Sequence, residues 1–213
     1  MRAKKWKFDK KVAEHFDEIA LTNIPHYEEV VEKCLEIAKR AFPDKKRTKI
    51  IDVGSATGYT MRKFIDQGYV HVYGVDSSES MLDKSRVKKN LILSNSFPRN
   101  EGPFHLVLAN WTLHFIQGRE RYISDISDSL KGGGILILSE KMSCSQLVHE
   151  RYHDFKKSMG VSEKAIRTKE RQLRGVLVPR PLEWYLKTLR KSGFKSIEII
   201  DSAWCFNTLL CRK

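Results

Sequence analysis

The stretch Ile50-Ile51-Asp52-Val53-Gly54-Ser55-Ala56-Thr57-Gly58-Tyr59 predicts a strand, a tight turn and the start of a helix. Apolar β-forming residues run into an acid, and small residues follow it. Because Gly54, Ala56 and Gly58 carry little or no side chain, a nucleotide-type ligand could approach the backbone here. The two glycines stand four residues apart, which differs from the G-x-G-x-x-G turn of dinucleotide-binding folds. A glycine-rich connection in some other α/β protein is the alternative interpretation of this stretch alone.

Length and composition indicate one domain, or one domain with a helical appendage, in a chain of 213 residues. The hydrophobic share of 41% is enough for a core, and apolar runs such as 135–138 are far too short to span a membrane. No apolar segment follows the basic N-terminus, so we expect no signal peptide. Cys34, Cys144, Cys205 and Cys211 form no C-x-x-C pair and show no metal spacing with histidine. We therefore expect reduced thiols in a cytoplasmic protein, and no metal site.

The chain is strongly basic, with 39 Lys and Arg against 26 Asp and Glu and a formal net charge of +13. Positive residues cluster at 2–11, 45–49, 86–89 and 167–180. Three interpretations are compatible with this charge: a solvated basic surface, an RNA-facing patch, or a site for an anionic small substrate. Direct binding of RNA is therefore left open by the sequence, whereas a membrane partner is not expected.

The order of predicted elements indicates a doubly wound α/β fold. Two amphipathic helices, 8–22 and 27–41, precede the first strand and could cover the turn as a lid. Strands and helices then alternate: helix 60–67, strand 70–76, helix 81–89, strands 91–93 and 104–110, helix 120–130, a flexible turn at 131–134, and strand 135–140.

The last third of the chain departs from this alternation. Basic helices are predicted at 144–158 and 162–174, a further helix at 182–191, and an antiparallel hairpin at 195–201 and 203–211. We divide the single domain, residues 1–213, into a helical lid (8–42), a ligand-binding core (48–140), a helical insertion (144–192) and a C-terminal hairpin (195–212). A mostly parallel seven-stranded sheet that closes with a hairpin resembles the Rossmann-like class I methyltransferase fold.

The same resemblance extends to the turn, because Asp52-x-Gly54-x-Ala56-x-Gly58 is similar to the S-adenosyl-L-methionine (SAM) turn of those enzymes. Asp76 ends the second predicted strand, 22 residues after Gly54. An acid at that position accepts hydrogen bonds from ribose hydroxyls in this fold class, although a cap on the next helix is the plainer alternative. Two further strand ends add polar side chains at this edge. Asn95 is placed to contact the adenine, and Asn110 lies near the expected reaction centre.

A narrower resemblance covers nearly the whole chain. The blocks that carry it are Phe8-Asp9-x-x-Val12-Ala13-Glu14-x-Phe16, Ile24-Pro25-x-Tyr27, Asn110-x-Thr112-Leu113-x-Phe115, Gly133-Gly134-x-Leu136-x-Leu138-Ser139-Glu140-Lys141 and His153-Asp154-Phe155-Lys156. They resemble the carboxy-S-adenosyl-L-methionine synthase family. That family usually dimerises and converts SAM and prephenate into carboxy-SAM, which is later used to modify a tRNA wobble uridine.

The resemblance implies a set of site residues. The cofactor positions are Tyr27, Gly54, Ser55, Ala56, Asp76, Ser77, Asn95, Ser96 and Asn110, to which the turn adds Asp52 and Gly58. Trp111 and Arg171 are the expected substrate contacts, and no residue is assigned a catalytic role. Arg167, Arg171, Arg174 and Arg180 supply local positive charge for a dianionic carboxyl donor.

Two positions depart from the family pattern. Asn95 stands where family members carry an aspartate, which loses a charge but keeps an acceptor. Glu170 stands where the family carries an arginine that grips the carboxylate of carboxy-SAM, and a glutamate there would repel it. Either Arg171 substitutes after a one-residue shift of the helix, or the chain does not make carboxy-SAM.

Three functions follow from these observations. In the first, the SAM methyl group is deprotonated to an ylide that captures carbon dioxide released from prephenate. In the second, an acceptor attacks the SAM methyl group in line, and catalysis is chiefly positioning of a small-molecule or RNA acceptor. No Asn-Pro-Pro-Tyr motif of amino-group methylating enzymes is present. The third is a module that binds SAM or RNA without turnover. We rank carboxy-SAM synthesis first because the family blocks span the chain.

Overall fold

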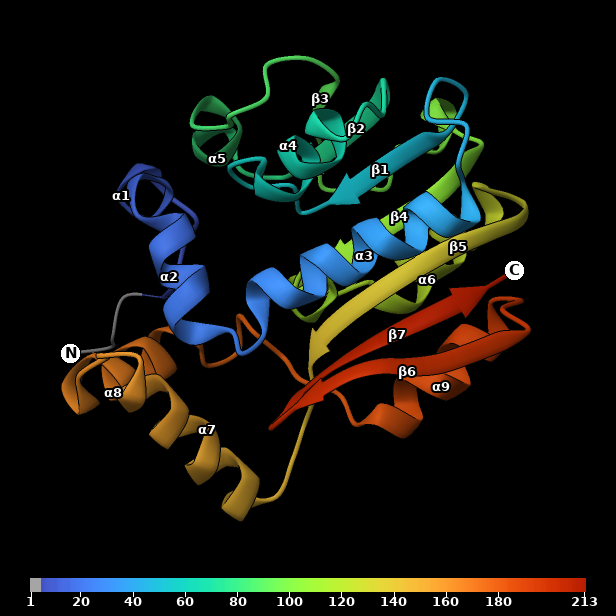
Figure 1. Cartoon of the computed structure of the whole chain (residues 1–213). Coiled ribbons are helices and arrows are strands. Elements are labelled where there is room, and N and C mark those ends of the chain that lie inside the picture. The colour runs from blue at the N-terminus through green and yellow to red at the C-terminus, as the bar shows by residue number, and fades with distance from the viewer. Residues whose placement is uncertain (1–4) are drawn as a thin grey trace.

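A seven-stranded sheet crosses the molecule in the computed structural model, which describes residues 5–213 (Figure 1). The strand order is β3-β2-β1-β4-β5-β7-β6, with β1–β5 parallel and β7 antiparallel to both of its neighbours. This confirms the predicted doubly wound fold and its closing hairpin. The strands are Lys49–Val53 (β1), His71–Asp76 (β2), Leu91–Leu93 (β3), Phe104–Asn110 (β4), Leu130–Lys141 (β5), Ser196–Ala203 (β6) and Phe206–Arg212 (β7).

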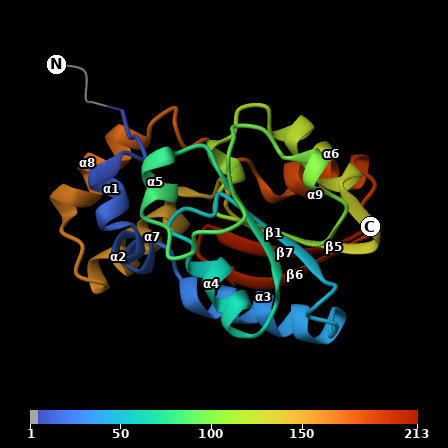
Figure 2. The same cartoon turned by 90° about the horizontal axis from the view of Figure 1, so that it is seen from above.

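Two hydrophobic cores lie on opposite faces of the sheet, and alternate residues of each central strand serve one or the other. In β4, Leu106 and Leu108 pack with α3 (Tyr27–Ala41) and α4 (Tyr59–Asp66). Val107 and Ala109 pack on the other face with α6 (Arg119–Asp128) and α9 (Leu182–Lys191). The view from above shows these two pairs of helices flanking the sheet (Figure 2). Burial of both faces explains the nearly continuous apolar runs of the central strands.

The remaining helices gather where the parallel strands end. They are α1 (Lys10–Glu14), α2 (Phe16–Asn23), α5 (Glu79–Asp83), α7 (Gln146–Ser158) and α8 (Glu163–Leu173), with the short 3₁₀ turns η1 (Arg99–Glu101) and η2 (Leu113–Phe115). In Figure 1 the arrow of β1 points toward α2, and α7 and α8 lie on the same side of the molecule. This arrangement encloses the carboxyl edge of the sheet, where ligands bind in such folds.

Several predicted elements differ from the structure by one to three residues at their ends, and three differ in kind or in length. The single helix predicted at 8–22 is two helices, because the backbone leaves helical geometry at His15 (φ −122°, ψ 15°). The helix predicted at 81–89 ends at Asp83, since the chain then turns so that Arg86 N–H donates to the Thr57 carbonyl at 2.9 Å. The turn predicted at 131–134 belongs to β5, which begins at Leu130 beside Phe104. No helix within residues 5–213 is long and apolar enough to span a membrane.

Candidate cofactor and substrate site

A cavity of about 330 Å³ lies at the carboxyl edge of the sheet, between the turn after β1 and the helices α2, α7 and α8. Most of the predicted site residues meet there. Those that line it are Tyr27, Asp52, Gly54, Ser55, Ala56, Asp76, Ser77, Asn95, Asn110 and Trp111. Gly58, Ser96 and Arg171 are not among its lining residues. Ligand contacts of all these residues stay predictions.

Packing within the protein itself requires the glycines of the turn. Gly54 has a φ of +70°, and a Cβ there would lie 1.8 Å from Oγ1 of Thr112. Gly58 has a φ of +78°, and a Cβ there would lie 2.6 Å from Oγ of Ser85. From the sequence, the lack of side chains was expected to leave room for a ligand. In the structure, side chains of two neighbouring loops lie against these glycines, which the sequence did not predict.

Asp76 connects the turn to the end of β2. Its Oδ2 accepts a hydrogen bond from Ala56 N–H at 3.0 Å, and its Oδ1 accepts one from Ser78 N–H at 2.8 Å. The cap of α5 is Ser78, whose Oγ accepts from Met81 N–H, so the plainer cap interpretation of Asp76 is wrong. Burial raises the pKa of Asp76, although the backbone N–H groups oppose that effect. The carboxylate lies against the cavity, where ribose hydroxyls could donate to it.

Asp52 is the second acid at this edge, near the end of β1. Its side chain is buried, and burial together with the charge of Asp76 raises its pKa to about 8. A carboxyl group held in this way is stabilised as a carboxylate when a cation binds beside it. SAM, with its sulfonium and ammonium groups, is a ligand of that kind.

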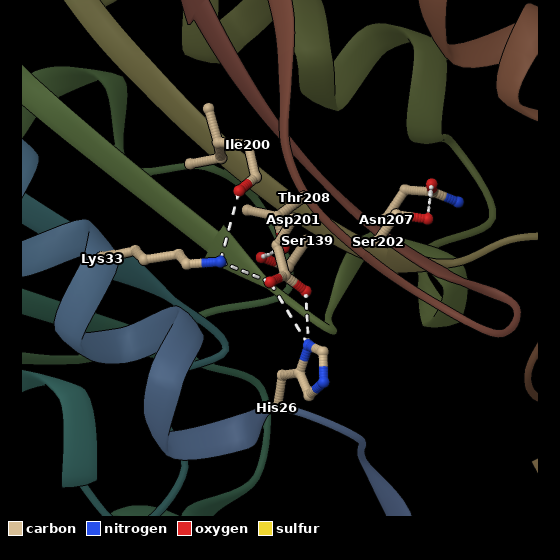
Figure 3. Close-up of polar contacts among 8 residues, drawn as sticks. All are labelled: His26, Lys33, Ser139, Ile200, Asp201, Ser202, Asn207 and Thr208. Atoms are coloured by element: carbon tan, nitrogen blue, oxygen red, sulfur yellow. Dashed lines mark hydrogen bonds and ion pairs between the residues drawn. The ribbon is translucent and has the colours of Figure 1, made fainter.

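Three neighbouring aromatic side chains line the same cavity as these acids. The Tyr27 ring lies 5.4 Å from that of Tyr59 and 4.8 Å from that of Trp111, measured between centroids. The start of α3, and hence Tyr27, is held by Asp201 of β6 (Figure 3). The Asp201 carboxylate accepts from Lys33 at 2.5 Å and contacts Nδ1 of His26 at 3.2 Å.

Asn110 lines the cavity at the end of β4, and its side-chain amide already has partners within the protein. Its Oδ1 accepts from the Ser139 hydroxyl at 2.8 Å, and its Nδ2 contacts the sulfur of Cys34 at 3.7 Å. Ser139 also lies 3.0 Å from the Thr208 hydroxyl on β7, beside the Asp201 cluster of Figure 3. The Asn110 amide therefore links β4 to β5 and α3, Ser139 extends the network to β7, and a ligand would share the amide with this network.

One carboxylate connects the segment predicted as a lid to the turn after β1. Asp17 of α2 accepts from the Thr57 hydroxyl at 2.5 Å and forms an ion pair with Arg86. Farther toward the N-terminus, the Phe8 carbonyl accepts from the Ser78 hydroxyl at 2.6 Å. These contacts bring Phe8 and Phe16 to the cavity wall, and the lid role of this segment stays a prediction.

Three lysines also line the cavity, and no sequence pattern predicted a site role for any of them. The Nζ atoms of Lys141 and Lys156 lie 4.5 and 4.4 Å from the centroid of the Tyr152 ring, and that of Lys169 lies 4.9 Å from the ring of Trp6. Burial, reinforced by repulsion from neighbouring lysines, lowers the pKa of Lys156 and of Lys169 to about 8. Lys141 and Lys156 end two of the quoted sequence blocks, whereas no pattern marked Lys169.

Glu170 lines the same cavity but does not stand alone. It accepts a hydrogen bond from His153, and its Oε1 lies 3.2 Å from Nε2 of His149 and 3.8 Å from Nζ of Lys156. Burial favours the neutral acid, yet His153 and Lys156 hold the pKa of Glu170 below its usual value. Arg171 lines an outer groove on the other side of this cluster, together with Arg167 and Arg174.

The family of the chain follows from comparison with known proteins. A model of the methyltransferase domain matches residues 26–197. The carboxy-S-adenosyl-L-methionine synthase of Helicobacter hepaticus is 33% identical, over 99% of this chain and 95% of that protein. The synthase of Nautilia profundicola is 32% identical, over 92% and 90% of the two chains. This chain belongs to the carboxy-SAM synthase family. The resemblance based on the sequence blocks is thereby confirmed, as is a SAM-dependent transferase with a SAM-binding domain.

Solved structures agree with the fold of this family member. A provisionally assigned SAM-dependent methyltransferase of Methanococcus maripaludis superposes with a TM-score of 0.67, over 100% of this chain and 97% of that one. A SAM-dependent methyltransferase of Mesorhizobium loti gives 0.59, over 84% and 96%. Their identities to this chain, 20% and 17%, are low, so these two likenesses show the class I methyltransferase fold alone.

Proposed function

We propose that this chain forms carboxy-SAM from SAM, with prephenate as the carboxyl donor. The observation that carries the proposal is the group of three lysines, Lys141, Lys156 and Lys169, at one end of the cavity. They supply the positive charge that the missing arginine would otherwise provide. Among the residues that the structure describes, Glu170 is the one carboxylate beside these three lysines, so an excess of positive charge remains for an anionic substrate.

The cavity fits SAM in size and in polarity. Its volume of about 330 Å³ falls within the range of about 300–1,000 Å³ that is usual for small-molecule sites. Asp52 and Asp76 lie at the turn, where the cationic groups and ribose of SAM would bind, and the lysines lie toward α7 and α8. A product that carries a sulfonium and a new carboxylate needs both kinds of charge in one cavity. SAM supplies the methyl carbon that gains the carboxylate.

The residues of the chain contribute binding, positioning and exclusion of water. The lysine ammonium groups would hold the carboxylates of the donor, and burial strengthens such ion pairs. Glu170 is already paired with His153, His149 and Lys156, so its charge does not face the donor without compensation. Phe8, Phe16 and Trp6 line the cavity on the lid side and would keep water from the reacting carbon.

We further infer that the protein works in the cytoplasm as a homodimer. This rests on the family resemblance, because family members usually dimerise and supply carboxy-SAM for tRNA modification. Direct contact between this chain and RNA is not needed for that role. Light scattering after size-exclusion chromatography would test the dimer: a mass of one chain at micromolar concentration would contradict it.

The test is incubation of the purified protein with SAM and prephenate, followed by mass spectrometry of the small molecules. We expect a product heavier than SAM by one carbon dioxide, together with consumption of prephenate. Unmodified SAM and intact prephenate would contradict the proposal.

Methyl transfer is the second candidate, and Glu170 is the observation that favours it, since an acid replaces the arginine of the family. Its signature is S-adenosylhomocysteine together with a methylated acceptor, from a small molecule or RNA. The same mass spectra distinguish it from carboxy-SAM synthesis. Binding of SAM with no product of either kind would indicate the non-catalytic module.

A further inference from the structure

Three side chains to which the proposed reaction gives no catalytic role converge between α7 and α8. They are His149, His153 and Glu170, and one ligand atom from each lies within 4.8 Å of the others. Nε2 of His149 is 3.2 Å from Oε1 of Glu170, and Nε2 of His153 hydrogen-bonds to the same oxygen. Two imidazoles are therefore directed at one carboxylate oxygen.

The helices fix this geometry. His149 and His153 are four residues apart on α7, which places both rings on the same face of the helix. Ser145 caps the start of α7, and Ser162 caps the start of α8, where its Oγ accepts from Ala165 N–H at 3.2 Å. The three side chains thus come from two capped helices rather than from loops, which favours a fixed ligand geometry.

We propose that His149, His153 and Glu170 bind a divalent transition-metal ion of the zinc type. Two imidazole nitrogens and a carboxylate oxygen are a ligand set that such ions prefer. Three protein ligands leave a fourth position free. His153 and Glu170 line the outer groove beside Arg167, Arg171 and Arg174, so a water molecule or an anion could reach that position from the groove.

The surrounding charges set a limit on the affinity. Glu170 is the one acid of the ligand set, whereas the Lys156 ammonium lies 3.8 Å from its Oε1. Lys141 lies on the same side, over the Tyr152 ring. Coulomb repulsion from these groups opposes a divalent cation, so removal of the Lys156 charge should tighten binding. An ion-pair cluster that binds no metal would show no such response.

In the sequence, spacings between cysteine and histidine indicated no metal site. This ligand set combines a His-x-x-x-His pair with a glutamate 17 residues farther along, on another helix. Glu170 also lines the cavity of the proposed reaction, but the metal site rests on this cluster alone, and its test needs neither SAM nor prephenate.

Metal binding to the full chain, freed of metal with a chelator, tests the proposal. We expect one Zn²⁺ per chain by equilibrium dialysis, and Co²⁺ to give visible absorption bands of a nitrogen- and oxygen-ligated ion. The variant His149→Gln/His153→Gln should bind at least about a hundredfold more weakly, since loss of outer partners alone costs ten- to a hundredfold. Lys156→Gln should bind more tightly.

His71→Gln is the matched control, because His71 is exposed on β2. It should leave binding unchanged. Glu170→Gln serves as a second ligand variant if the double variant does not fold, as judged by circular dichroism. Absence of saturable binding in the unaltered chain, or equal binding by the ligand variants and the control, would overturn the proposal.

Discussion

Nζ of Lys156 lies 3.8 Å from Oε1 of Glu170, and His153 hydrogen-bonds to that same oxygen. The acid that departs from the family pattern is thus surrounded by cationic and hydrogen-bonding groups. Lys156 is almost fully buried, with 4% of its surface exposed, and it faces the cavity together with Lys141 and Lys169. In the proposed reaction, the positive charge that meets the carboxyl donor would therefore come from lysines on three separate elements instead of one arginine.

Loss of the Lys156 charge should impair binding of the carboxyl donor. We expect Lys156→Met to raise the KM for prephenate about ten- to a hundredfold, since a hydrogen bond to a charged group contributes about 1.5–3 kcal/mol. The affinity for SAM alone should change little. Steady-state kinetics with the donor varied would measure this.

Lys157→Met is the matched control, because Lys157 is exposed on the same helix and faces Asp154 at 4.0 Å. It should leave the KM unchanged. Equal effects of the two substitutions would show that overall charge, and not the cavity, matters.

Substitution of Asp76 should weaken SAM binding and loosen the turn. In Asp76→Asn, one side-chain oxygen becomes an NH₂ group, which cannot accept from both Ala56 N–H and Ser78 N–H. We expect a loss of about 1–3 kcal/mol in the free energy of unfolding, the cost of a buried unsatisfied group. Denaturant titration and calorimetry of SAM binding would measure both effects. Asp66→Asn, at an exposed pair with Arg62, should change neither.

The raised pKa of Asp52 predicts a particular pH dependence. The Asp52 pKa of about 8 lies above the ordinary 3.8. Between these two pH values the folded, ligand-free chain therefore holds a proton that the unfolded chain has released. Stability of the ligand-free chain should therefore fall as the pH rises from about 4 to about 8, and level off above that. A cationic ligand favours the carboxylate form of Asp52. SAM should therefore bind more tightly as the pH rises toward about 8, and its binding below that pH should release a proton.

Calorimetry in two buffers of different ionisation enthalpy would detect that proton at about pH 7 and its absence at about pH 9. Asp52→Asn should abolish the proton release and flatten the stability profile. Identical proton release by the variant would assign the titration to another group.

Asp17 should control how long SAM stays bound. Asp17→Ala leaves the Thr57 hydroxyl and Arg86 without their partner, which frees α2 from the turn. We expect SAM to dissociate about tenfold faster, in line with one charge-assisted hydrogen bond. Stopped-flow fluorescence would follow the dissociation. Glu18→Ala, whose side chain is 78% exposed one residue farther along α2, should have the rate of the unaltered chain.

The fold could be predicted from the sequence because its signals are local. The alternation of Leu106, Val107 and Leu108 between two cores appears in the chain as an uninterrupted apolar run. Helix α3 and helix α9 were predicted with the bounds that the structure gives them. The break at His15 was missed because it depends on how α1 and α2 pack, which the apolar periodicity does not record.

The site was predictable only in part. Asp76 and Asp52 end or nearly end their strands, and strand ends of a parallel sheet meet at one edge, so their proximity followed from the pattern. The lysines Lys156 and Lys169 lie on helices outside the repeat, whose orientation toward the cavity depends on tertiary packing. The partners of Glu170 were hidden for the same reason, since His149 and His153 lie on the neighbouring helix.

Transfer of an isotopic label tests the central claim most directly. Prephenate would carry ¹³C in the carboxyl group that it loses when its ring becomes aromatic, and the chain would be incubated with it and unlabelled SAM. The account predicts a product heavier than SAM by one labelled carbon dioxide, with no S-adenosylhomocysteine formed. S-adenosylhomocysteine in place of that product, or a carboxylated product without the label, would contradict it.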